Sequence, residues 1–441
     1  MFGAIQSAFR IPELKRRIFW TLGILFVYRL GGHIPTPGVD GGALASFFES
    51  QTSGTIFELY DLFAGGNFSK ATIFALGIMP YISASIILQL FGAVIPYFER
   101  LQKEGEEGRK RITQYTRYST VGLAAVQAIG IAFFLESLNN QVPGTVVEHT
   151  GLGFRALTVL TLTTGTMFVM WLGEMITERG IGNGISLIIM IGIVSQFPYD
   201  VLNTIRGAQQ GTLNPLFLVL LAVGMFAITM FVVWVNNAHR RVPVQYARKM
   251  VGRKMVGGQS THLPLRVITA GVIPIIFAQS IIIAPSTLGS FFQNSDLVTS
   301  IVGLFRPGGL TYLVTYAALI IFFTYFYTAI TFNPVDLAEN MKKFGGFVPG
   351  IQPGKHTADY LDKILLRITL PGALFLAAIA VLPDILIYRA GVPFYFGGTS
   401  LLIIVSVCLD TLKQIESHLL MRHYDGFMKR GRMKAQGMRT R

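Results

Sequence analysis

The chain has 441 residues, of which 51% are hydrophobic and only 14% are charged, and its mean hydropathy is +0.53. One soluble core cannot enclose so much apolar material, so the composition excludes an ordinary soluble protein and predicts a protein solvated by lipid. A net charge of +14 would suggest a nucleic-acid ligand in a polar chain, but here the basic residues cluster between long apolar runs, which is typical of membrane topology.

Metal, disulfide and enzymatic chemistry are not indicated by the reactive side chains. The only cysteine, Cys408, lies inside an apolar stretch, so the sequence offers neither a disulfide framework nor a thiolate metal site. The seven histidines are scattered, without HExxH or a similar metal-binding spacing. The sequence also lacks a nucleotide-binding loop and a catalytic constellation, so we expect no cofactor, no metal and no enzyme activity.

The first apolar run follows a basic cluster, as the apolar region of a secretory signal peptide does. The cluster consists of Lys15, Arg16 and Arg17, and the run continues to Ile34 without a small-x-small cleavage site. We therefore expect a retained first membrane span.

Ten apolar segments are each close to the roughly 20 residues that a helix needs to cross the hydrocarbon of a bilayer. The fifth is the shortest. In chain order they are residues 18–34, 71–96, 118–138, 154–172, 185–202, 215–235, 267–292, 311–332, 368–387 and 394–412.

The stretch at residues 55–67, directly before the second segment, has apolar residues at helical spacing but is too short to span a membrane. It ends in the flexible pair Gly65 and Gly66. The spacing is consistent with an interfacial helix and also with a movable stopper in the external mouth of a pore.

Two basic loops exceed the length that a tight connection requires, at residues 236–266 and 333–367. Such basic loops either fix the membrane topology and contact anionic lipid, or form a docking surface for a large partner such as a ribosome. The predicted docking residues are Arg240, Arg241, Arg248, Lys249, Arg253, Lys254, Lys342 and Lys343. The Gly-rich residues 180–184 resemble a phosphate loop only weakly, and we interpret them as the turn into the fifth span.

The loops also predict the orientation. With the N-terminus inside, 31 of the 37 lysines and arginines fall on the cytoplasmic side, including those of the tail at residues 413–441. The positive-inside rule then places both termini in the cytoplasm. The six external basic residues are Arg29, Lys70, Arg155, Arg206, Arg306 and Arg389.

The sequence contains an internal repeat. Residues 77–84 of the second span align with residues 271–278 of the seventh, and residues 184–189 of the fifth align with residues 398–403 of the tenth. Five spans separate both pairs, and because five is odd the paired segments cross the membrane in opposite senses. Chance recurrence of Gly, Pro and Ile explains one match more easily than two at the same offset. The repeat predicts two inverted halves. They span residues 1–210 and 211–441.

The repeated segments carry isoleucines instead of ionisable groups. The charged residues inside the spans lie toward span ends, which disfavours an ion-coupled solute transporter. Rings of bulky aliphatic side chains close pores by dewetting, although a membrane isoleucine is more often lipid-facing or core. Pro80 and Pro274 predict matching kinks, which are either hinges of a lateral opening or packing kinks. The isoleucines are Ile78, Ile82, Ile86, Ile185, Ile189, Ile276 and Ile403.

Several strings, in the same order along the chain, resemble those of the SecY family of bacterial protein-export channels. Among them are GIMPYISASII, WLGEMITERGIGNGIS, GGFVPGIQPG and PFYFGGTSLLI. One departure is Gln352, where the common family pattern PGIRPG has arginine, and this weakens the assignment of a motor contact to that position.

The resemblance implies an all-α integral membrane protein: a clamshell of ten transmembrane helices in two inverted five-helix halves, with an hourglass pore. It implies a side gate between spans two and three and spans seven and eight. The implied function is to translocate unfolded secretory proteins across the bacterial inner membrane and to release membrane segments laterally into lipid. The implied partners are small SecE-like and SecG-like subunits, the SecA motor, the ribosome, preproteins with signal sequences, and membrane lipid.

The resemblance also implies the gating residues. The pore ring falls on Ile78, Ile82, Ile185, Ile189, Ile276 and Ile403. The plug helix falls on Ile56, Phe57, Glu58, Leu59, Tyr60, Asp61, Leu62, Phe63, Ala64, Gly65, Gly66 and Asn67. The two alternatives to a channel are a solute transporter with two inverted halves of five spans and a membrane scaffold that transports nothing.

Overall fold

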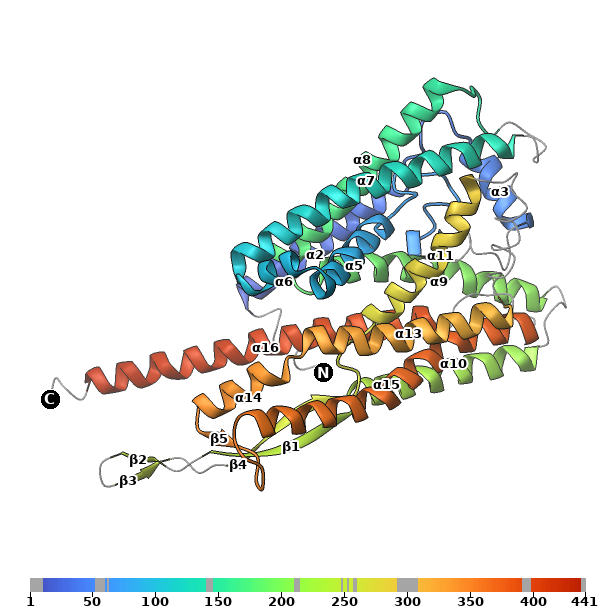
Figure 1. Ribbon diagram of the computed structural model, residues 1–441. Helices are drawn as coiled ribbons and strands as arrows, with labels where there is room; N and C mark the ends of the chain where they lie inside the picture. Colours follow the sequence, from blue (N-terminus) through green and yellow to red (C-terminus); the bar gives the residue numbers. More distant parts are fainter. Residues whose placement is uncertain are drawn as a thin grey trace.

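The chain folds mainly into α-helices, with a small antiparallel sheet at one end (Figure 1). The structure is a computed structural model that describes residues 11–51, 60–61, 63–139, 146–209, 215–246, 249–251, 254–256, 260–291, 308–390 and 398–437.

Each predicted span overlaps one long helix. These helices are α2 (Pro12–Gly31), α5 (Met79–Val94), α7 (Glu106–Leu138), α8 (Leu152–Arg179), α9 (Gly184–Gln209), α10 (Pro215–Asn236), α11 (Ile273–Phe291), α13 (Leu310–Thr331), α15 (Lys355–Ala390) and α16 (Gly398–Gly437). Shorter helices are α3 (Gly41–Gln51), α6 (Pro96–Lys103) and α14 (Pro334–Lys343).

By length and apolarity, six helices of the described chain can cross a membrane: α7, α8, α9, α10, α13 and α15. The pair α5 and α6, bent by 97° at its break, would make a seventh span. Helix α10 carries large apolar side chains on its outer surface: Leu220, Phe226 and Trp234 are 66%, 68% and 70% exposed. Such a surface needs lipid or another membrane helix around it, and the chain is a multi-pass helical membrane protein.

Three helices extend well beyond their predicted spans. Helix α7 begins at Glu106, α15 begins at Lys355, and α16 continues to Gly437. Their extra turns are rich in charged residues. A hydropathy window detects only the part of a helix that is apolar enough to lie in hydrocarbon, so it misses these polar ends.

The predicted kinks at Pro80 and Pro274 are wrong. Helix α5 begins at Met79 and α11 begins at Ile273, so each proline is the second residue of its helix. A proline in the first turn removes no intrahelical hydrogen bond and favours helix initiation. The predicted starts of these spans, at residues 71 and 267, are too early.

The repeat coincides with matching backbone geometry. The aligned glycines Gly77 and Gly271 have φ angles of 55° and 60°, and a helix begins two residues after each. In the second match, α9 begins at Gly184 and α16 begins at the aligned Gly398. Thus both sequence matches mark helix starts.

Helices α9 and α11 connect the early and late parts of the chain. Figure 1 shows α2, α5, α7 and α8 on one side, and α10, α13, α15 and α16 on the other. Helix α9 contacts α8 and α16, whereas α11 contacts α5, α7 and α13. The core cluster of buried residues runs through these contacts.

The two basic loops contain strands. The sheet has the order β4–β1–β5, formed by β1 (His239–Tyr246), β4 (Ser260–Arg266) and β5 (Gly346–Phe347), and a second ladder joins β2 (Lys249–Val251) to β3 (Lys254–Val256). Val242 and Val244 alternate with exposed residues in β1 and pack in one cluster with Leu361 of α15 and Met341 of α14. The loops therefore form one folded unit.

Candidate pore constriction

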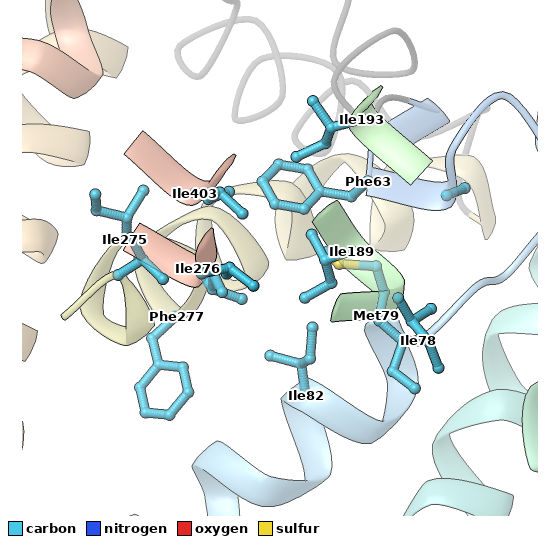
Figure 2. Packing of buried hydrophobic residues seen from close by; sticks show 14 of the residues in the cluster. Phe63, Ile78, Met79, Ile82, Ile189, Ile193, Ile275, Ile276, Phe277 and Ile403 are labelled. Atoms are coloured by element: carbon cyan, nitrogen blue, oxygen red, sulfur yellow. The ribbon is translucent and has the colours of Figure 1, made fainter. Parts of the chain in front are cut away.

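The six predicted ring residues come from four helices. Ile78 and Ile82 lie at the start of α5, Ile185 and Ile189 on α9, Ile276 on α11, and Ile403 on α16. All except Ile185 are at most 5% exposed and belong to one hydrophobic cluster. Figure 2 shows Ile82, Ile189 and Ile276 converging from three of these helices.

Local structure positions these side chains. Residues four apart share one face of a helix, as do Ile185 and Ile189 on α9. Helix α9 starts at a fixed point because the Asn183 side chain caps it, with Oδ1 accepting hydrogen bonds from the Ile185 and Ser186 amides at 3.1 and 3.2 Å. Ile185 itself is only partly buried and lies next to Gly173 of α8.

Sequence reasoning missed two neighbours of the ring. Ile193 and Met79 are 0% and 3% exposed and lie in the same cluster (Figure 2). Ile193 follows Ile189 by four residues, a spacing that places both on the same face of α9 and could have predicted its position. Met79 follows Ile78 directly, and only the backbone turn before α5 places it here.

The predicted plug is described in part. Ile56, Phe57, Glu58, Leu59 and Leu62 lie outside the described residues, whereas Tyr60, Asp61 and residues 63–67 lie within them. Phe63 is 2% exposed, and Figure 2 shows its ring between Ile193 and Ile403. Hence this segment places an aromatic side chain directly against the isoleucine cluster.

Helix α2 holds this segment through polar contacts. The Arg29 guanidinium donates to the Gly65 carbonyl at 3.1 Å, and the Tyr28 hydroxyl donates to the Ala64 carbonyl at 3.4 Å. Asn67 donates through Nδ2 to the Tyr28 hydroxyl at 3.3 Å. Arg29, which the sequence predicts to be an external basic residue, thus also binds the backbone of the predicted plug.

Two glycines bring the segment against α9. Gly65 and Gly66 have φ angles of 72° and 76°, in the left-handed region that favours glycine. A Cβ atom on Gly65 would lie only 2.7 Å from the Cα atom of Gly192, one turn beyond Ile189. The close approach therefore requires glycine.

Asp61 closes the loop that follows the plug segment. Its Oδ1 atom accepts hydrogen bonds from the amides of Phe68 and Ser69, both at 2.9 Å. Burial raises the pKa of the Asp61 carboxyl, while the hydrogen bonds from Ser69 and Phe68 and the charge of Lys70 act in the opposite direction.

A hollow of about 460 Å³ lies beside the start of α9. Its lining includes Asn236 of α10 and Ser406 of α16, whose side chains are joined by a hydrogen bond of 3.1 Å. It also includes Arg266 and Asp410, which form an ion pair at 3.6 Å. Apolar residues such as Val272 and Leu409 complete the lining, so the hollow combines polar and apolar surface.

The predicted docking residues lie on the folded unit of the two loops. Arg240 and Arg241 are exposed on β1, and Lys342 and Lys343 are exposed in the last turn of α14. The pairing of β1 with β5 joins the two loops. Lys249 and Lys254 lie in β2 and β3, whereas Arg248 and Arg253 lie outside the described residues.

Comparisons with known proteins point to one family. Residues 72–412 match the family profile described as SecY. The chain is 50% identical over 432 residues to the protein translocase subunit SecY of Escherichia coli (strain K12), a match that covers 97% of this chain and 96% of that protein. It is 46% identical over 427 residues to the SecY subunit of Aquifex aeolicus (strain VF5), covering 97% and 99%.

Solved structures show a similar fold. A structure described as that of a protein conducting channel has a TM-score of 0.64 and 19% identity, covering 94% of this chain and 96% of that one. Sec61 in the canine ribosome-channel complex has a TM-score of 0.59 and 17% identity, covering 94% and 96%.

Proposed function

Because this chain belongs to the SecY family of protein translocase subunits, we propose that its isoleucine cluster is the constriction of the protein-conducting channel. In this role an unfolded secretory chain passes through the constriction, and apolar membrane segments leave sideways into lipid. The chain carries out no catalytic step, and its partners supply the driving force.

The observation that carries the proposal is the meeting of Ile82, Ile189, Ile276 and Ile403. They come from four different helices, and the cluster that contains them is entirely hydrophobic. An aliphatic collar excludes water and ions at rest, yet it has no fixed ligands that would select one solute. Ile78 and Ile185 complete the proposed ring at its edges.

The plug segment forms the second part of the proposed gate. Its described residues, 60–61 and 63–67, lie against the ring at Phe63 and against α9 at Gly65. The described part of the segment contacts α2 through hydrogen bonds and α9 through close packing, so a translocating chain that separates the ring helices also removes the surface on which the segment rests. The side gate then corresponds to the contact of α11 with α5 and α7.

The proposed topology has ten spans in two inverted halves, at residues 1–210 and 211–441, with both termini in the cytoplasm of a bacterial cell. The matching helix starts after Gly77 and Gly271, and at Gly184 and Gly398, support the halves. The excess of basic residues in the loops predicted to be cytoplasmic supports the orientation in the inner membrane.

The proposed partners are SecE-like and SecG-like membrane subunits, the SecA motor and ribosomes. The names of the relatives support a translocase complex, and two similar structures are ribosome-bound Sec61 and Ssh1 complexes. The surface proposed for SecA and ribosomes is the folded unit that carries Arg240, Arg241, Lys342 and Lys343. Its basic charge suits an acidic or RNA-containing partner.

Photocrosslinking tests the constriction. A photoreactive residue replaces Ile276, or in a control Val314, which is 60% exposed on α13. A preprotein is arrested midway through the complete translocase in membrane vesicles. We expect strong crosslinks from position 276 and weak ones from position 314. Intact translocation without crosslinks from position 276 would contradict the proposed path.

A further inference from the structure

The turn between α8 and α9 connects the early helices to α16. Helix α8 ends at Arg179 and α9 begins at Gly184. Within this turn the Gly182 amide donates to Oε1 of Gln414 on α16 at 2.9 Å. Gly182 has a φ angle of 90°, and a Cβ atom there would lie 2.9 Å from the Leu187 side chain and 3.1 Å from Oγ1 of Thr411. The turn therefore fits closely against α16.

The same turn is fixed to the early helices. The Ile181 amide donates to Oγ1 of Thr21 on α2 at 3.0 Å, and the Gly184 amide donates to Oγ1 of Thr177 on α8 at 2.9 Å. The Gly-rich sequence resembles a phosphate loop, but its amides are not available to a phosphate, because protein side chains already accept their hydrogen bonds. The turn thus acts as a structural joint between α2, α8 and α16.

Apolar contacts reinforce the joint. Ile181 of the turn and Leu14 of α2 are both 4% exposed and form a small separate cluster. Ile415 and Leu419 of α16 pack against it. Gln414, which hydrogen-bonds to the turn, is thus followed directly by Ile415, whose apolar side chain packs against the same turn.

From this joint, α9 and α16 run side by side in opposite directions. Eight residues beyond Gly182, Sδ of Met190 lies 3.6 Å from Sγ of Cys408, six residues before Gln414 on α16. Ile189 lies next to Met190 on α9, and Ile403 lies five residues before Cys408 on α16; both belong to one hydrophobic cluster. Two contacts, Gly182 with Gln414 and Met190 with Cys408, thus set how α9 lies against α16 between the turn and the middle of the helix pair.

We propose that Gln414 is a positioning residue, which fixes the register of α9 against α16 by holding the Gly182 amide. The helix that follows Gly182 carries Ile185 and Ile189, so a shift of the turn moves both relative to Ile403. This second step rests on the proposed function, in which these isoleucines seal the pore. Gln414 is exposed to water, which competes for the bond, so its loss has a graded effect.

The test measures the register and the seal separately. Met190→Cys supplies one thiol opposite Cys408, the single cysteine of the sequence. In this background Gln414→Leu removes the acceptor, Gln414→Glu retains one, and Glu416→Leu is the matched control on an exposed position of the same helix. Each variant is assembled with its partners in membrane vesicles. The readouts are the rate of crosslinking by a short bifunctional thiol reagent, per amount of channel, and the ion leak at rest.

We expect Gln414→Leu to change the crosslinking rate several-fold and to raise the leak, while Gln414→Glu and Glu416→Leu match the parent. An unchanged crosslinking rate in Gln414→Leu overturns the inference, as does an equal change in Glu416→Leu. A changed rate with an unchanged leak supports the role of Gln414 in the register, but it contradicts the proposed function of the isoleucines as the seal.

Discussion

Gly65 is a residue at which the predicted plug segment packs against the backbone of the ring helix α9. Its left-handed backbone, and the 2.7 Å that would separate a Cβ atom here from Gly192, leave no room for another residue type. Gly122 of α7 offers a contrast, because a Cβ atom there would meet no atom within 4 Å. Glycine is therefore required at position 65, whereas at position 122 a larger residue fits without a clash.

We predict that Gly65→Ala weakens the closed position of the plug. The left-handed backbone alone costs an alanine about 1–2 kcal/mol, which corresponds to a rise of roughly tenfold in the displaced population, since 1.4 kcal/mol is a factor of ten. Ion leak of resting vesicles should rise modestly, because the isoleucine ring stays in place when the plug is displaced. Gly122→Ala, in a helix where alanine is favoured, should leave the leak unchanged. Equal leak in Gly65→Ala and the parent would argue against the plug.

The sheet β4–β1–β5 is the element that turns two long basic loops into one surface. Its inner face buries Val242 and Val244 against α14 and α15, while its outer face carries exposed polar residues. The apolar residues of β1 alternate with polar ones, which is the pattern of a half-buried strand. Partners that bind either loop therefore meet a preformed surface.

We predict that Val244→Asp unfolds this unit locally. Val244 is 3% exposed, and burial of an unpaired charge costs several kcal/mol. Limited proteolysis within residues 236–266 and 333–367 should become markedly faster, while the membrane helices stay resistant. His262→Asp, on an exposed position of β4, is the control and should be cleaved like the parent. Resistance of the Val244→Asp channel would show that the sheet contributes little to the order of these loops.

The helices were predictable from hydropathy, but their ends and the strands were not. The window found a helix at every predicted span because lipid-facing and core residues are both apolar. It placed the start of α5 at residue 71 because the turn up to Gly77 is as apolar as the helix. It missed β1 because charged residues flank a short apolar alternation.

Two kinds of information gave the candidate site. The repeat and the family resemblance identified Ile82, Ile189, Ile276 and Ile403, which lie far apart in the sequence but share one cluster. The anchoring of the plug by Arg29 depends on tertiary contacts alone. No sequence spacing links a residue at the end of one helix with a carbonyl 36 positions later.

At the scale of the whole molecule, the proposed function makes the ring and the plug two seals along one path. Ions must pass both, so the tighter seal limits the flux and the loss of one leaves the other in place. The contact of Phe63 with the cluster means that the two seals also support each other (Figure 2).

We predict a more than additive leak when both seals are weakened. Ile276→Ser and Gly65→Ala should each raise the resting ion flux of vesicles modestly, and the double variant should exceed the sum of the two. Contacting residues commonly show such coupling. The flux is measured at equal channel content, with Val314→Ser as the control for a serine on an exposed helix face. Additive fluxes would indicate two independent leak routes instead of one path.

The short link between the sheet and α11 has a mechanical consequence. Strand β4 ends at Arg266 and α11 begins at Ile273. The link is held at its first residue, because the Val267 amide donates to the Ala238 carbonyl at 3.1 Å and a Cβ atom on Gly372 of α15 would lie 2.7 Å from the Val267 carbonyl oxygen. A rotation of the sheet is therefore expected to move the start of α11, and a displacement of α11 from α5 and α7 is expected to move the sheet in turn.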